Sequence, residues 1–419
     1  AEAALATAAA RAASAAAKSV SSQSVSSEGS GAWGVLAPRR EAAPTQAATA
    51  RPVRLRGHTG AVLCCAAFPT GSRVLTGSAD GTAIIWSSLG EQLAVLRGHS
   101  GRVTACAVFP TEDQVVTTSE DEAAGIIWTS TGDWLAVLQG AQHCEVFPVG
   151  DRVLTARKAM ESQHSHCAAI FSRSGELVTM LGGRPGSITA CAVFPCGQRV
   201  LTGSKSGAVS LWSSFGAARP MQTELSGHSG VITSCAVFPS GERALTTSQD
   251  GTASIWWTAA AAAAPGKGGA GEPKRQLAVL RGHTGPLCAC VVLPSGDAVL
   301  TVGEDRKGIL WSSDGELLAE LAGHSHRVGC CAAFPSGAGV LTASGDGSGI
   351  VWSSSGAGRA VHGRRLVELH GHSAAVLAVT VFPSGERVLT VSEDSTGLIW
   401  PAFSFFDGFA GRRIQTAPD

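Results

Sequence analysis

Five potential transition-metal ligands lie close together about a third of the way along the chain. They are His143, Cys144, His164, His166 and Cys167. Imidazole nitrogens and thiolates are the usual protein ligands of zinc, which structural sites hold in a tetrahedron. Three of the five fall in, or just beyond, a single lengthened turn, a spacing unlike the paired ligands of structural zinc sites. Two interpretations follow, a metal site or an altered copy of a repeated unit.

A second set of side chains has the composition of a nucleophilic site. His58, Ser78 and Asp80 are the residue types of an acyl-transfer triad, in which the imidazole activates the hydroxyl. An enzyme needs one nucleophile, whereas this trio recurs at the same spacing. Repetition favours a structural use, in which each buried polar group satisfies another. The other complete copies are His99/Ser119/Asp121, His228/Ser248/Asp250, His324/Ser344/Asp346 and His372/Ser392/Asp394.

The trio belongs to a larger repeat. Each copy has an apolar stretch ending at Phe-Pro, a Val-Leu-Thr stretch and a stretch ending at Trp, as in residues 105–128, 234–256 and 331–352. Short runs of β-branched residues bounded by Gly, Pro, Ser or Asp predict β-strands. A fourth strand of the form LAVLRGH, as in residues 93–99 and 277–283, joins consecutive units. The aromatic residue ending the third strand falls at Trp86, Trp128, Phe171, Trp212, Trp256, Trp311, Trp352 and Trp400.

Eight copies predict eight four-stranded sheets. One small sheet cannot bury both of its faces, so the sheets must stack, and a ring closes the stack. We therefore predict an all-β, eight-bladed β-propeller of four-stranded antiparallel blades over residues 51–400. Residues 53–56 resemble a fourth strand with no unit before it, and are expected to complete the last blade and remove its unpaired edge. Seven blades, with residues 140–171 outside the ring, are the alternative.

This repeat resembles the WD-repeat family, whose fold is a β-propeller. The resemblance rests on a Gly-His pair and a Trp about 30 residues later, and covers about residues 53–400. The Asp that follows this Trp in the family is usually Ser here. The resemblance implies that His, Ser, Asp and Trp form a structural hydrogen-bond network in each blade. Beyond the residues above, that network would include Trp86, Trp128, Trp256, Trp311, Trp352 and Trp400, with His283 and Asp305 in the sixth copy, where Gly303 replaces Ser.

Seven cysteines occupy equivalent positions, three residues before the Phe-Pro or Leu-Pro pair. This position is expected to be small and buried on the innermost strand. Sheets about 10 Å apart do not allow disulfides between blades, so free thiols are expected, as in a reducing intracellular compartment, either the cytoplasm or an organelle interior. Cys144 then belongs to the repeat, which favours an altered third blade over a metal site. The seven are Cys65, Cys106, Cys144, Cys191, Cys235, Cys290 and Cys331.

Two segments flank the repeats. Residues 1–50, rich in Ala and Ser, are expected to form an extended or partly helical arm, with a composition similar to that of an organellar transit peptide. Residues 401–419 form a tail with a dense Phe cluster that is expected to dock on a protein surface. The candidate partner contacts are Phe403, Phe405 and Phe406 in this tail and Arg157, Lys158, His164 and His166 in the third copy.

Composition also limits the function. The formal net charge is zero, so no nucleic-acid partner is expected. No apolar run reaches the roughly 20 residues of a membrane span, so any membrane association would be peripheral, within a complex. We expect a non-catalytic, cofactor-free scaffold for protein-protein interactions, as a subunit of a larger assembly. The alternatives are a module that recognises a peptide or small ligand at the channel mouth, and a propeller enzyme.

Overall fold

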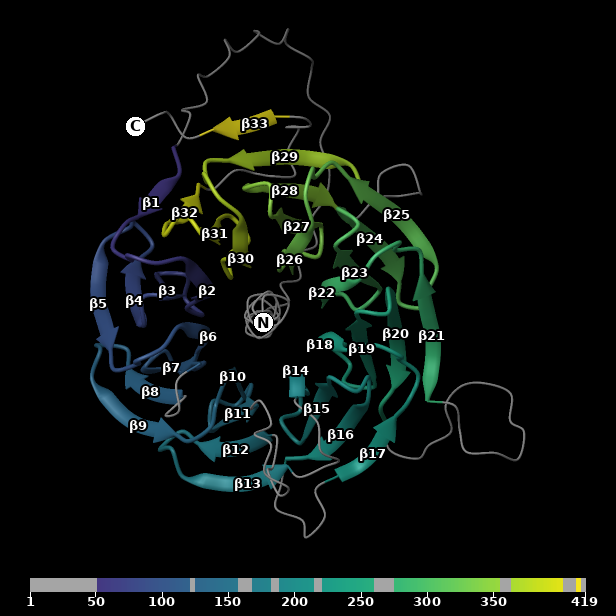
Figure 1. The fold of residues 1–419 in the computed structure, drawn as a ribbon, viewed down its shortest axis with the longest axis horizontal. Helices are drawn as coiled ribbons and strands as arrows, with labels where there is room; N and C mark the ends of the chain where they lie inside the picture. Colours follow the sequence, from purple (N-terminus) through teal and green to yellow (C-terminus); the bar gives the residue numbers. More distant parts are fainter. Residues whose placement is uncertain are drawn as a thin grey trace, which may run out of the picture.

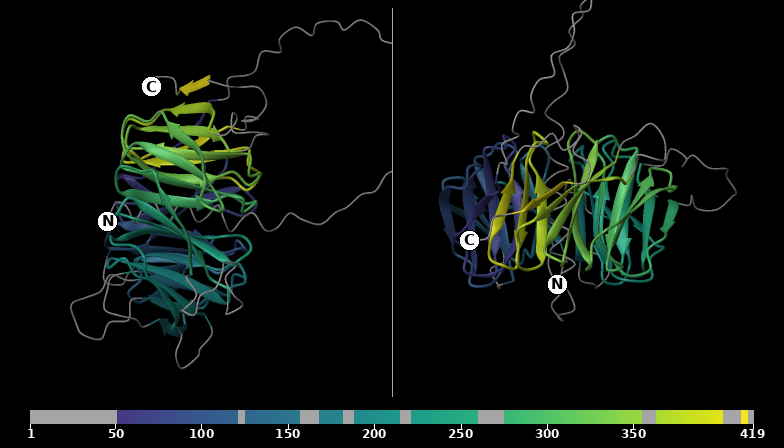
Figure 2. Two further views of the ribbon diagram at one scale, coloured as in Figure 1. Left: turned by 90° about the vertical axis from the view of Figure 1, so that its right-hand side faces the viewer. Right: turned by 90° about the horizontal axis from the view of Figure 1, so that it is seen from above.

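The computed structural model describes residues 51–120, 125–156, 168–181, 188–214, 221–259, 275–354, 363–401 and 412–415. In these ranges the chain forms β-strands, gathered into eight sheets around a central axis (Figure 1). From the side, the ring is a short cylinder whose strands run between its two faces (Figure 2). The eight-bladed prediction is therefore correct, and the seven-bladed alternative is excluded.

Each sheet is an antiparallel blade, numbered here in chain order, and the first strand of each blade lies nearest the axis. Blade one contains β2 (Val62–Ala67), β3 (Arg73–Ser78), β4 (Thr82–Ser87) and β5 (Gln92–Arg97). Blade two contains β6 (Val103–Val108), β7 (Gln114–Ser119), β8 (Gly125–Thr129) and β9 (Trp134–Leu138). Blade three contains β10 (His143–Val146), β11 (Arg152–Ala156), β12 (Ala168–Ser172) and β13 (Leu177–Leu181). Blade four contains β14 (Ile188–Val193), β15 (Arg199–Ser204), β16 (Val209–Ser213) and β17 (Met221–Leu225).

The second half of the ring repeats this order. Blade five contains β18 (Ile232–Val237), β19 (Arg243–Ser248), β20 (Thr252–Trp257) and β21 (Gln276–Arg281). Blade six contains β22 (Leu287–Val292), β23 (Ala298–Gly303), β24 (Lys307–Ser312) and β25 (Leu317–Ala322). Blade seven contains β26 (Val328–Ala333), β27 (Gly339–Ser344), β28 (Ser348–Ser353) and β29 (Arg365–His370). Blade eight contains β30 (Val376–Val381), β31 (Val388–Ser392), β32 (Gly397–Trp400) and β1 (Val53–Leu55).

Blade eight combines strands from far apart in the sequence. Strand β1 pairs antiparallel with β32, with Val53 opposite Ile399 and Leu55 opposite Gly397. Leu55 is buried in a cluster that spans blades eight and one and includes Ile399 and Trp86. The first described strand is thus the outer strand of the last blade, and its side chains join that blade to the first.

A fifth strand lies on blade seven. Strand β33 (Arg412–Gln415) pairs in parallel with the outer strand β29, with Glu368 opposite Arg413. This strand was not predicted from the sequence, because four residues with two adjacent arginines lack a strand-like apolar pattern. The pairing covers the outer edge of this blade (Figure 1).

Arginines at the start of the second strand join neighbouring blades. Arg152 stacks on Phe147 of its own blade and donates hydrogen bonds to the carbonyl oxygens of Ser214 and Gly197 in blade four, at 2.9 and 3.1 Å. A buried guanidinium needs such acceptors, and a ring face supplies cation–π attraction. The same stacking recurs for Arg73, Arg199, Arg243 and Arg387 on the Phe of their own blades.

Candidate functional site

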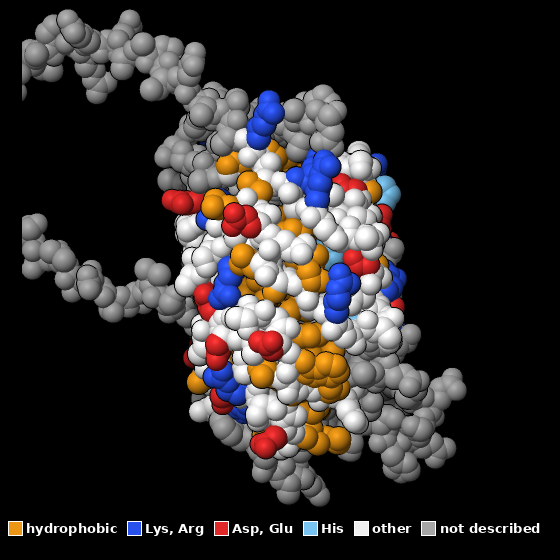
Figure 3. Space-filling model, turned by 90° about the vertical axis from the view of Figure 1, so that its left-hand side faces the viewer, with side chains coloured by type: hydrophobic (Ala, Val, Ile, Leu, Met, Phe, Trp, Pro, Cys, Tyr) orange, Lys and Arg blue, Asp and Glu red, His pale blue; other side chains and the backbone are white. Residues whose placement is uncertain are grey.

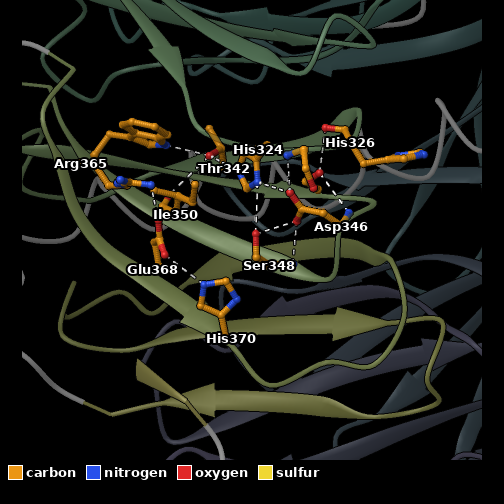
Figure 4. Close-up of polar contacts among 12 residues, drawn as sticks. His324, His326, Thr342, Asp346, Ser348, Ile350, Arg365, Glu368 and His370 are labelled. Carbon is orange, nitrogen blue, oxygen red and sulfur yellow. Dashed lines mark hydrogen bonds and ion pairs between the residues drawn. The ribbon is translucent and has the colours of Figure 1, made fainter. Parts of the chain in front are cut away.

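The repeated polar network is clearest in blade seven (Figure 4). The imidazole of His324 lies between Asp346 and Thr342, with Nδ1 at 3.1 Å from Asp346 Oδ2 and Nε2 at 3.0 Å from Thr342 Oγ1. Trp352 Nε1 donates to the same Thr342 Oγ1 at 2.8 Å. Ser348 Oγ donates to Asp346 Oδ1 at 2.6 Å. These contacts therefore join the loop before β26, the strands β27 and β28, and the tight turn between those two strands.

Four other blades contain the same contacts of the imidazole and the indole among described residues. In blade one, His58 lies 3.2 Å from Asp80 and 2.9 Å from Thr76, and Trp86 donates to Thr76. Blade two keeps the contacts of its His and Trp with Thr117, while Asp121 lies outside the described residues. The full sets in the other blades are His228/Thr246/Asp250/Trp256, His283/Thr301/Asp305/Trp311 and His372/Thr390/Asp394/Trp400.

Serine occupies a different place from the one a nucleophile would need. Ser78 Oγ donates to the carbonyl oxygen of Gly60 at 2.9 Å and accepts the backbone N–H of Asp80 at 3.1 Å. Ser344 and Ser392 make the same pair of contacts in their blades, and Ser248 accepts the equivalent N–H of Asp250. The side chain on Nε2 of the imidazole is instead threonine, the last residue of the Val-Leu-Thr stretch. The recurrence of threonine at this position in every copy was the signal available in the sequence.

Blades three and four lack parts of this network. In blade four, Trp212 donates to Thr202 at 2.8 Å, and Ser206, at the Asp position, contacts Ser204. In blade three, Phe171 replaces Trp, and Thr155 Oγ1 donates to the carbonyl oxygen of Ala169 at 3.3 Å. The third blade nevertheless keeps four paired strands. Strand pairing and the packing of its buried side chains hold its register.

Burial and hydrogen bonding shift the pKa values of these groups. Burial lowers the pKa of His58, His228 and His283, and the attraction of the neighbouring carboxylate only partly opposes it. Burial alone would raise the pKa of Asp80 and Asp250. Hydrogen bonds from the hydroxyl and N–H of a Thr and from a second backbone N–H outweigh burial and lower both values to about 2. The shifted pKa values favour a neutral imidazole beside an ionised carboxylate in these networks.

These shifts predict how stability depends on pH. Histidines with a lowered folded-state pKa bind protons better when unfolded, so their contribution is complete above the usual value of 6.5 and declines as the pH falls below it. The aspartates add stability above 3.8 that is lost between 3.8 and about 2. The free energy of unfolding should therefore fall in two stages on acidification, measured by denaturant titration at each pH. A flat profile through both ranges would contradict this.

The structure describes only some of the residues predicted as metal ligands or partner contacts. Cys144 is buried in β10 and the neighbouring His143 is half-buried. Among the described residues, no three His, Cys, Asp or Glu side chains are grouped to hold a metal ion. Arg157, Lys158, His164, His166, Cys167, Phe403, Phe405 and Phe406 lie outside the described residues.

The innermost strands contain a ring of thiols. The seven aligned cysteines, from Cys65 to Cys331, are all buried and form no disulfide, whereas Cys196 is exposed. Burial, followed by the proximity of other thiols, raises the pKa of Cys65 and Cys331 well above its usual value. These side chains act as small apolar packing groups rather than nucleophiles. No helix in the described part of the chain is long and apolar enough to span a membrane.

An eight-bladed propeller whose blades are joined internally by His, Thr, Asp and Trp defines a class of repeat protein. The family model for the WD domain, G-beta repeat, matches residues 51–87, 90–126, 175–213, 219–256, 274–312, 315–353 and 363–401. The chain belongs to the WD-repeat family. The unmatched stretch between the second and third matches contains β10, β11 and β12, the part of blade three that lacks Trp and the Gly-His pair. No curated protein matches the chain.

Proposed function

We propose that this protein is a non-catalytic scaffold for protein-protein interactions and a subunit of a larger multiprotein assembly. WD-repeat propellers are commonly protein-interaction scaffolds. The observation that supports a non-catalytic role is that solvent does not reach the imidazoles. Their side chains are 0–2% exposed in the five complete networks, and both ring nitrogens contact other side chains of the same blade. A substrate cannot reach a base in that position.

The repetition of the network supports the same proposal. A catalytic centre needs one constellation in which a nucleophile contacts its base. Here Ser78 contacts a carbonyl oxygen and a backbone N–H, and its counterparts in blades seven and eight do the same. In the blades that contain the network, the polar groups hold the blade in shape and leave the ring surface for partners.

The test is to isolate the tagged full-length chain under gentle conditions from the cells that produce it and to measure the mass of the native particle. We expect most of the chain in a complex with other polypeptides at fixed stoichiometry. Cross-linking of that complex should place the contacts on the faces and rim of the ring. Recovery of the chain only by itself, at native expression levels, would count against the scaffold.

A further inference from the structure

The outer strand of blade seven differs from other outer strands in how deeply its side chains are buried. Leu366 and Glu368 of β29 are 3 and 8% exposed. At the position of Leu366, Leu93 in β5 and Leu135 in β9 are 51 and 47% exposed, and at the position of Glu368, Val279 in β21 is 38% exposed. Figure 3 shows the side of the ring that carries β5 and β9, where apolar side chains reach the surface. The outer strand of blade seven is therefore buried where these other strands are open to solvent.

Strand β33 occupies the edge of β29 by backbone pairing. The two strands run parallel, with Val367 opposite Arg412 and His370 opposite Gln415. The eight blades are complete without β33, because the outer place beside β32, the strand that precedes β33 in the chain, is held by β1. A strand of four residues that the ring does not need for closure is the kind of element that opens locally at low cost.

The charges on β29 indicate what this edge accepts (Figure 4). The carboxylate of Glu368 accepts a hydrogen bond from Arg365 Nη1, and its other oxygen lies 3.1 Å from His370 Nε2. All three residues belong to β29. The residue opposite Glu368 in the register of the added strand is Arg413. Opposite charges at facing positions of two strands are favourable, so this edge favours a strand with a basic residue opposite Glu368.

We propose that the outer edge of β29 is a strand-addition site for a partner protein, which inserts an extended segment parallel to β29 with a basic residue opposite Glu368. Strand β33 is the internal occupant that this segment replaces. Since β33 pairs only with Val367 to His370, a partner strand that also pairs with Arg365 and Leu366 forms a longer ladder. Backbone hydrogen bonds then supply affinity, and the charge opposite Glu368 supplies specificity. The site rests on the proposed scaffold function in requiring a protein partner.

The first test removes the internal occupant from the full-length chain. In Arg413→Pro/Ile414→Pro, one of the two prolines must replace a residue whose N–H points toward β29, and proline has no N–H. A fluorescein-labelled peptide of residues 410–417 is titrated with this variant by fluorescence anisotropy. We expect it to bind the variant about tenfold more tightly than the unchanged chain, where the tethered strand competes at a millimolar effective concentration. The same peptide in reverse order is the control for strand direction and should not bind.

The second test removes the charge on the edge strand. Within the proline variant, Glu368→Gln should weaken peptide binding about threefold, because the pairing of opposite charges is lost. Glu320→Gln is the matched control. Glu320 has the same register position in β25, but its side chain is 47% exposed and paired with Lys307. It should leave peptide binding unchanged, and circular dichroism checks that every variant folds.

The third test locates the partner in the isolated assembly. A photo-crosslinking residue, p-benzoylphenylalanine, replaces the exposed Arg364, next to the start of β29. We expect cross-links to an extended segment of another polypeptide, and a higher yield in the proline variant.

Three outcomes would overturn the proposal. These are no peptide binding to the proline variant, equal binding of the reversed peptide, and cross-links only within the chain itself. Each would leave the scaffold proposal standing if the assembly is still recovered. Recovery of the chain only by itself would instead remove the scaffold, and the partner strand with it.

Discussion

Replacing Thr342 by valine is expected to lower the free energy of unfolding by about 2–4 kcal/mol. Valine has a similar shape but no hydroxyl, so His324 Nε2 and Trp352 Nε1 would each lose a buried partner. Each orphaned group costs about 1–3 kcal/mol. Neither can turn to water without disturbing the strands that hold it, since Thr342 is 1% exposed.

Blade three provides the control for this substitution. Thr155 occupies the same strand position and is similarly buried, but among the described residues its hydroxyl makes one hydrogen bond, to the Ala169 carbonyl oxygen at 3.3 Å. Thr155→Val should change stability by less than about 1 kcal/mol. Urea unfolding of both variants, followed by circular dichroism, makes the comparison. Equal losses would show that the threonine acts through packing rather than through the network.

Deleting residues 1–56 is expected to destabilise the ring by about 5 kcal/mol or more. The loss of the buried Leu55 side chain alone costs about 2–5 kcal/mol, and the β1–β32 backbone pairing adds to this. The deletion also exposes the edge of β32, so the product should aggregate more readily. Thermal unfolding and size-exclusion chromatography measure the two effects.

Deleting residues 1–50 is the control, because it retains β1. A synthetic peptide of residues 51–58 added to the longer deletion should restore part of the lost stability by filling the same edge. If both deletion variants have the same stability, or the peptide has no effect, the pairing of β1 does not stabilise the ring.

The sequence predicted the parts of this fold that depend on local pattern. The strand spacing and the eight aromatic positions led directly to eight blades, and the third copy kept its register despite Phe171. The features that could not be predicted from the sequence depend on contacts between distant segments. The arginine contacts need carbonyl oxygens of the next blade, as Arg152 shows with Ser214. Strand β33 needs the edge of β29, which no pattern within four residues can indicate.

The candidate site was only partly predictable for a similar reason. The sequence brought His324, Asp346 and Trp352 into one network, and the structure places them together. It did not identify Thr342 as the link between them. A threonine beside two apolar residues is typical of any strand, and only the pairing of β27 with β28 aligns its hydroxyl with the indole.

The pairing of β1 with β32 also sets an order of events during synthesis. Val53 and its partner Ile399 are 346 residues apart, from 399 minus 53. At translation rates of about 5–20 residues per second, the first strand waits roughly 20–70 s for its partner. Throughout that time Leu55 lacks the blade-eight part of its cluster. The final seam of the ring therefore forms only after nearly the whole propeller has left the ribosome.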